Sequence, residues 1–206
     1  MLDRFALALL KPGLDAVAAA IARRGVGADA LTLGGLACAG AAAVAISQQA
    51  FGTGLVLLLV NRAADGLDGP VARVAGATDR GAFLDITADF LFYASVPLAF
   101  AVADPARNAL AAAALLAAFI GTGSSFLAFA VMAQRRGLTR TAYPDKGFYY
   151  LGGLTEGTET VACFIAMCLW PPHFAAIACA FATLCGLTVV ARLVAGWRLL
   201  GPPQLP

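Results

Sequence analysis

Charged residues are scarce in this sequence. Only 13% of the 206 residues are Asp, Glu, Lys or Arg, about half of the roughly 25% found in soluble globular proteins, whereas 61% are hydrophobic. There is one histidine, and the five cysteines lie in apolar stretches without the paired spacing of a zinc site. These scarcities exclude a soluble enzyme, a disordered tail and a module that binds nucleic acid.

Long uncharged runs are what the sequence has instead. They cover residues 30–61, 108–134 and 160–191, and the mean hydropathy is +0.82. Each run is long enough for a helix of about 20 residues to cross a bilayer. Residues 1–206 are therefore expected to form one all-α, membrane-embedded domain of six transmembrane helices. Polar residues, Pro and Gly place these helices at roughly 31–47, 51–75, 81–103, 107–134, 148–169 and 174–200.

The first 25 residues have a different pattern. Apolar side chains from Leu2 to Ile21 recur at intervals of three and four, with charged residues between them and a break expected at Pro12-Gly13. This pattern predicts an amphipathic helix that lies on the membrane surface.

Basic residues are distributed unevenly about the expected helices. The turns after odd-numbered crossings hold only Arg107. Under the positive-inside rule, both termini of this multi-pass protein are expected in the cytoplasm. The termini and the other turns hold Arg4, Lys11, Arg23, Arg24, Arg73, Arg80, Arg135, Arg136, Arg140, Lys146 and Arg198.

Four carboxylates occur where leucine would be usual, in the second and third expected crossings. Asp65 and Asp68 are three residues apart and Asp85 and Asp89 are four apart, so each pair lies on one helix face. Four intramembrane Asp residues cost roughly 10 to 14 kcal/mol, so something must neutralise them. The short turn between the two helices can bring both pairs to one point, and a site made only of oxygens suits two divalent ions, Mg²⁺ or Mn²⁺.

Simpler roles for the same residues stay open. An isolated Asp near a helix end can cap the helix or pair with an interfacial arginine, and Arg62 or Arg73 could be that partner. Buried carboxylates also mark proton and cation paths, so an ion-conducting membrane protein is an alternative function.

The segment 65–89 resembles the signature of the CDP-alcohol phosphotransferases, also called CDP-alcohol phosphatidyltransferases. The sequence Asp65-Gly66-Leu67-Asp68-Gly69-Pro70-Val71-Ala72-Arg73 is followed, after a spacer, by Gly81, Asp85 and Asp89 at intervals of four. The expected plan of a surface helix and six crossings is also similar to that of the family. Ahead of the first crossing, where the family often has Pro-Asn, two residues and Thr, this chain has Ala28-Asp29 and keeps Thr32.

The resemblance implies roles for individual residues. Asp65, Asp68, Asp85 and Asp89 would hold two divalent cations, and Asp89 would also be the catalytic base. The CMP portion of the donor would be bound by the residues that match the nucleotide side of the signature. These are Asp29, Thr32, Gly69, Ala72, Arg73 and Gly81.

The activity that the resemblance implies is transfer of a substituted phosphate from a CDP-alcohol to an acceptor hydroxyl, with release of CMP, in phospholipid biosynthesis. The short chain resembles bacterial members of the family. This resemblance favours CDP-diacylglycerol as donor and a small polar alcohol as acceptor. It also implies a homodimer in the inner membrane, in contact with membrane lipids. Transfer from CDP-choline or CDP-ethanolamine to a diacylglycerol is the alternative.

Basic residues late in the chain are candidates for the acceptor pocket. Arg135, Arg140, Lys146 and Arg192 could bind a phosphorylated acceptor, or they could set topology and contact lipid headgroups. Glu156 and Glu159 form a further carboxylate pair, which could be a partner for Arg192 or Lys146 or could recognise acceptor hydroxyls.

Overall fold

The computed structural model describes residues 2–137 and 155–201. Within these ranges the regular elements are seven α-helices and one short 3₁₀ turn, so the all-α expectation is confirmed for this part of the chain. The elements are α1 (Leu2–Arg23), α2 (Ala28–Ser47), α3 (Phe51–Ala75), α4 (Asp79–Ala103), α5 (Pro105–Arg135), α6 (Gly157–Leu169), η1 (Pro171–His173) and α7 (Phe174–Leu199). Five of the six expected crossings agree with these helices to within three residues at each end. The expected helix over 148–169 is wrong at its start, because Glu156 is the N-cap of α6 and the helix begins only at Gly157; residues 148–154 lie outside the described residues.

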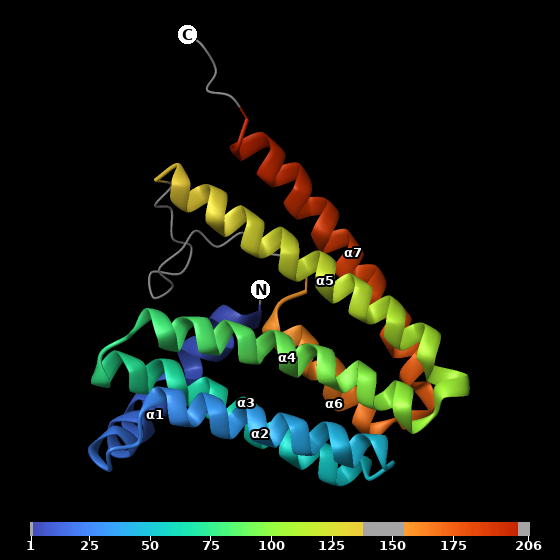
Figure 1. The fold of residues 1–206 in the computed structure, drawn as a ribbon, viewed down its shortest axis with the longest axis horizontal. Coiled ribbons are helices and arrows are strands. Elements are labelled where there is room, and N and C mark those ends of the chain that lie inside the picture. The colour runs from blue at the N-terminus through green and yellow to red at the C-terminus, as the bar shows by residue number, and fades with distance from the viewer. Residues whose placement is uncertain (1, 138–154, 202–206) are drawn as a thin grey trace.

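The long helices form two packed groups. Helix α2 packs against both α3 and α4, and α1 packs against α3. Helix α5 packs along α7 and joins this pair to the first group through α4 (Figure 1). The turn between α3 and α4 and the C-terminal end of α5 lie toward the same side of the molecule in Figure 1.

Four helices are long and apolar enough to cross a membrane, namely α2, α4, α5 and α7 with its preceding 3₁₀ turn. Helix α3 is also 25 residues long, but it carries Arg62 at its middle and Asp65, Asp68 and Arg73 in its second half. Helix α6 has 13 described residues, about 20 Å of helix, which is short of the roughly 30 Å hydrocarbon core. The described part of the chain is therefore an all-helical membrane protein with four clear candidate spans.

Helix α1 is continuous from Leu2 to Arg23. The break expected at Pro12-Gly13 is wrong. A proline inside a helix removes one hydrogen bond and can be accommodated by a bend, so it does not have to end the helix.

A short turn joins α3 to α4, and α2 packs against both helices. Gly76 follows the last residue of α3 with φ of +100°, a conformation that favours glycine. The Thr78 hydroxyl oxygen then accepts a hydrogen bond from the Gly81 backbone N–H at 3.0 Å and caps α4. Only residues 76–78 separate the two helices, so side chains near the end of α3 face those near the start of α4.

Aromatic rings fill the centre of the bundle. The rings of Phe100 and Phe174 stack at 4.5 Å, and the ring of Phe92 meets that of Phe164 edge-on at 5.7 Å. Glycine permits close approach of α2 and α3, because a Cβ on Gly35 would lie 3.3 Å from the Cβ of Ala64. This packing places the acidic half of α3 beside α2, which also packs against α4.

Candidate active site

Helices α3 and α4 bring acidic side chains together at one end of the bundle. Carboxylate oxygens of Asp65, Asp68 and Asp85 all lie within 4.8 Å of one another. Asp68 is buried, and the other two are half-buried. The expected convergence of the two pairs is therefore present for these three side chains.

The fourth carboxylate, Asp89, contacts an arginine. The Arg62 guanidinium donates a hydrogen bond from Nη1 to Asp89 Oδ1 at 3.0 Å, and the same nitrogen lies 3.4 Å from Asp65 Oδ2. The Arg62 side chain is only 14% exposed, whereas both carboxylates are 34% exposed. Arg62 thus pairs with Asp65, as the sequence allowed, and also reaches across to α4, which the sequence did not indicate.

Thr32 of α2 supports the buried member of the cluster. Its hydroxyl donates a hydrogen bond to Asp68 Oδ2 at 2.7 Å, in the range of a charge-assisted bond, and also lies 3.1 Å from the Ala28 carbonyl oxygen. Both Thr32 and Asp68 are less than 10% exposed. The contact orients the Asp68 carboxylate toward the other two.

Residues matched to the nucleotide side of the signature lie around the α3–α4 turn. Asp29 Oδ2 accepts a hydrogen bond from Arg80 at 2.6 Å. A Cβ on Gly81 would lie 3.2 Å from Asp29 Oδ1, so this glycine leaves room for that carboxylate. Arg73 reaches Asp15 of α1 at 3.3 Å.

The Arg73 side chain also approaches the helix around Gly69. A Cβ on Gly69 would lie 3.9 Å from the nearer guanidinium nitrogen of Arg73. Ala72 precedes Arg73 on the same helix, and its carbonyl oxygen accepts the N–H of Gly76 that ends α3. These small residues therefore keep the backbone accessible beside the carboxylates.

Comparison with known proteins agrees with the signature. The profile described as CDP-alcohol phosphatidyltransferase matches residues 26–190. Inner membrane protein YnjF of Escherichia coli (strain K12) is 47% identical over 200 residues, which are 97% of each chain. The chain belongs to the CDP-alcohol phosphatidyltransferase family. The membership predicted from the Asp-Gly pattern is confirmed, and the protein is a transferase of phospholipid synthesis.

Solved structures share the fold of this transferase. Phosphatidylinositol phosphate synthase of Mycobacterium tuberculosis, in complex with manganese and citrate, matches with a TM-score of 0.69 at 23% identity, over 89% of this chain and 88% of that one. The same enzyme with CDP-DAG bound matches with a TM-score of 0.66 at 22% identity, over 89% and 93% of the two chains. The fold similarity thus includes nearly all of the transferase.

The candidate acceptor residues of the transferase are spread along its second helical group. Arg192 of α7 is buried, donates a hydrogen bond from Nη1 to the Thr122 carbonyl oxygen at 2.9 Å and lies 5.6 Å from the ring centre of Phe126. Arg135 lies nine residues beyond Phe126 on α5, about 14 Å along the helix. Arg140 and Lys146 lie outside the described residues.

Glu156 and Glu159 have a local role in the transferase. They form a reciprocal cap at the start of α6, in which Glu159 Oε2 accepts a hydrogen bond from the Glu156 backbone N–H at 3.1 Å. Their spacing of three residues is that of a capping box, a signal that the sequence already contained.

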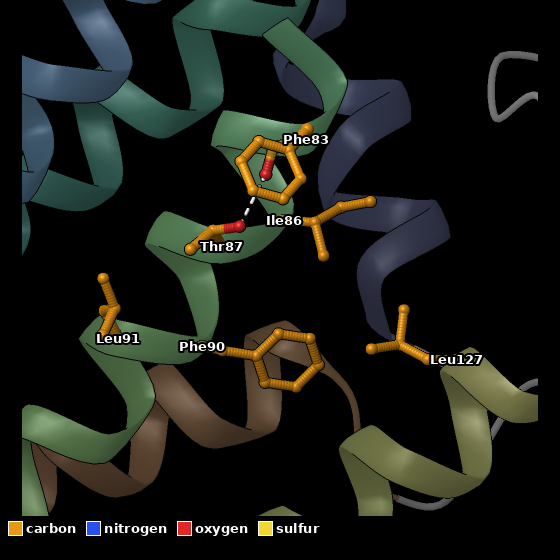
Figure 2. A pocket seen from close by; sticks show the side chains of 6 residues that line it. All are labelled: Phe83, Ile86, Thr87, Phe90, Leu91 and Leu127. Atoms are coloured by element: carbon orange, nitrogen blue, oxygen red, sulfur yellow. Dashed lines mark hydrogen bonds between the residues drawn. The ribbon is translucent and has the colours of Figure 1, made fainter. Parts of the chain in front are cut away.

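A hollow lined by side chains of α4 and by Leu127 of α5 is apolar (Figure 2). The Thr87 hydroxyl, the polar group in its lining, donates to the Phe83 carbonyl oxygen at 2.7 Å. At 100° per residue, the lining side chains of α4 are centred on the face away from Asp85 and Asp89. This hollow therefore lies apart from the acidic cluster. It is lined by Phe83, Ile86, Thr87, Phe90, Leu91 and Leu127.

Proposed function

We propose that this transferase moves a phosphatidyl group from CDP-diacylglycerol to the hydroxyl of a small polar alcohol and releases CMP. The observation that carries the proposal is the cluster of three carboxylates, within 4.8 Å of one another, on two helices of a membrane bundle. The related fold of the M. tuberculosis synthase, which has been solved with manganese and with CDP-DAG, supports the choice of donor.

The carboxylates fit divalent cations. Oxygens that share one Mg²⁺ at about 2.1 Å lie about 3.0 Å apart when adjacent and about 4.2 Å apart when opposite, so the oxygens of the cluster, within 4.8 Å of one another, would draw together around a bound ion. Its ligands are all hard oxygens, which suit Mg²⁺ or Mn²⁺. We assign one ion to Asp65, Asp68 and Asp85, and a second to the side of the cluster that includes Asp89.

The reaction assigns distinct tasks to the carboxylates. When bound, the two ions would stabilise the negative charge on the diphosphate and on the transferred phosphoryl group. Asp89 would accept the proton of the acceptor hydroxyl, whose oxygen forms a bond to the phosphorus that carries the diacylglycerol. The bond between that phosphorus and the bridging oxygen breaks, and the oxygen leaves with CMP.

The CMP portion would lie beside the α3–α4 turn. Asp29, Thr32 and Arg73 offer hydrogen-bonding groups there, and Gly69, Ala72 and Gly81 keep the backbone accessible. A phosphorylated acceptor would be bound by the basic residues of the second helical group. We assign that role to Arg135, Arg140, Lys146 and Arg192.

The membrane arrangement follows from the same site. We propose six crossings, in which α3 crosses because most of its charges gather toward one end, and α6 forms part of the fifth. The distribution of basic residues supports a cytoplasmic location for the acidic end and both termini, where nucleotide and metal ions are available. The name of the E. coli relative supports location in the inner membrane of a bacterium, and we expect a homodimer there.

A transfer assay tests the proposed function. Purified protein is incubated with Mg²⁺ or Mn²⁺, labelled CDP-diacylglycerol and a panel of glycerol phosphate, inositol, inositol phosphate and serine, and CMP release is measured. Parallel reactions contain CDP-choline or CDP-ethanolamine with diacylglycerol. CMP release that depends on one acceptor of the panel identifies it, and the absence of acceptor-dependent release in every reaction would contradict the proposal.

Two matched variants locate the chemistry. Asp89→Asn should lower the rate by about 10²- to 10⁴-fold, because it removes the base. Asp79→Asn removes an exposed carboxylate from the first turn of α4 and should leave the rate within about twofold of wild type. If both variants retain full transfer activity, the acidic cluster has another role, and ion flux in reconstituted vesicles then tests conduction.

A further inference from the structure

Arg62 occupies a position that the transfer reaction does not explain. Its Nη1 atom lies between two carboxylates on different helices, 3.0 Å from Asp89 Oδ1 and 3.4 Å from Asp65 Oδ2. Both carboxylates belong to the proposed metal site. A positive charge that belongs to the protein is thus already paired with half of the acidic residues of that site.

The guanidinium is held firmly in this position. Arg62 Nε donates a hydrogen bond to Asn61 Oδ1 at 2.7 Å, and Asn61 Nδ2 donates in turn to the Gly35 carbonyl oxygen of α2 at 2.8 Å. The central carbon of the guanidinium lies 3.9 Å from the ring centre of Phe92. The side chain is therefore fixed on three sides, and its position is not that of a loose surface arginine.

A metal ion and this guanidinium compete for the same oxygens. An ion that bound Asp65 Oδ2 and Asp89 Oδ1 at about 2.1 Å would occupy nearly the space that Nη1 now fills. Arginine keeps its charge at any pH that a protein tolerates, so it cannot relieve the repulsion by losing a proton. Its side chain must move aside, or the ion binds these oxygens weakly.

We propose that Arg62 is a built-in counter-cation, which neutralises Asp65 and Asp89 in the metal-free protein and lowers the affinity for the ion that binds at Asp89. The inference rests on the proposed metal site. It implies unequal ion sites, with the ion at Asp65, Asp68 and Asp85 bound more tightly than the second.

Binding of Mn²⁺ alone tests the competition. Free Mn²⁺ is measured by electron paramagnetic resonance during titration of the full-length wild-type protein, Arg62→Gln and the control Arg107→Gln, which removes one positive charge at the opposite end of the bundle. We expect wild type to bind a tight and a weak ion, and the weak step to become roughly three- to tenfold tighter in Arg62→Gln. Weaker binding, or binding equal to that of Arg107→Gln, would overturn the proposal.

Thermal unfolding in EDTA tests the neutralising role without any metal. Arg62→Gln should lower the unfolding temperature, and adding Asp89→Asn should restore part of it, because the repulsion among the carboxylates then falls. Saturating Mn²⁺ should remove the difference between Arg62→Gln and wild type. If Arg62→Gln lowers the unfolding temperature equally with and without Asp89→Asn, Arg62 only packs on Phe92, and the inference is refuted.

Two further results can be interpreted, namely absence of Mn²⁺ binding and failure to recover the Arg62→Gln protein. If wild type binds no Mn²⁺, the proposed metal site fails, and the EDTA measurements alone then decide the role of Arg62. If Arg62→Gln protein is recovered only when Mn²⁺ is present throughout purification, or only together with Asp89→Asn, the counter-charge is supported. Recovery of neither of these, but of Arg62→Met, which keeps a long side chain on Phe92 without the charge, would show a packing role instead.

Discussion

The hydrogen bond between Thr32 and Asp68 allows a quantitative test of the site. Thr32→Val keeps the shape of the side chain and removes the hydroxyl that donates to Asp68 Oδ2 at 2.7 Å. A bond to a charged group is worth about 1.5 to 3 kcal/mol, and both partners here are less than 10% exposed, so the full range applies. At 1.4 kcal/mol per factor of ten, this corresponds to roughly 10- to 100-fold.

The same size of effect is expected for metal binding, because removing the partner that orients a metal ligand costs about 10- to 100-fold in affinity. Titration of Mn²⁺ into Thr32→Val should show this loss in the tight step, and Thr32→Ser, which keeps the hydroxyl, should bind within about threefold of wild type. Equal affinities of the Val and Ser variants would refute the role given to this hydrogen bond.

Other predictions concern the nucleotide side and the start of α6. Gly81→Ala should raise the KM for CDP-diacylglycerol about three- to tenfold with a smaller change in kcat, because the added Cβ would lie 3.2 Å from Asp29 Oδ1 and displace it. Gly34→Ala is the control, since no atom lies within 4 Å of the added Cβ. Equal KM values for the two variants would count against nucleotide binding at Asp29. Glu159→Ala should destabilise the protein by about 1 kcal/mol in thermal or denaturant unfolding, whereas Glu159→Gln, which still accepts from the Glu156 N–H, should lose less. If the two Glu159 variants unfold alike, the capping box does not stabilise α6.

The acidic cluster could be predicted because it depends on helix geometry alone. Intervals of three and four place Asp65 with Asp68, and Asp85 with Asp89, whatever the rest of the bundle does. The turn of residues 76–78 is short enough to keep the end of α3 close to the start of α4. Three of the four carboxylates therefore meet where the sequence placed them.

The partners of these carboxylates could not be predicted in the same way. Thr32 and Asp68 are 36 residues apart, and their contact depends on how closely α2 approaches α3 near Gly35. Arg62 could be matched with Asp65 by its spacing of three, but its contact with Asp89 depends on the rotation of α4 relative to α3. Such rotations are set by packing of side chains across the bundle, which no local pattern contains.

Hydropathy alone does not identify every helix that is long enough to cross the membrane. A window of hydropathy recognises α2, α4, α5 and α7 and passes over α3, although α3 is as long as α4. The charges that remove α3 from this group are those that form the site. In α3 the charges of the site thus lower the hydropathy of a helix that is long enough to cross a membrane, whereas α4 keeps an apolar second half and is recognised.

The contacts of the four carboxylates make them chemically unequal before any ligand arrives. Asp68 is buried and oriented by a hydroxyl, which favours a permanent metal ligand. Asp89 is more exposed and paired with a guanidinium, so its oxygens become available when Arg62 moves or is outcompeted. A carboxylate that must accept a proton during transfer has to be freed in this way, and it has to lie where the acceptor can reach it. Under the proposed function, the difference between Asp68, which is buried, and Asp89, which is paired with Arg62, would let the first hold an ion while the second serves as base.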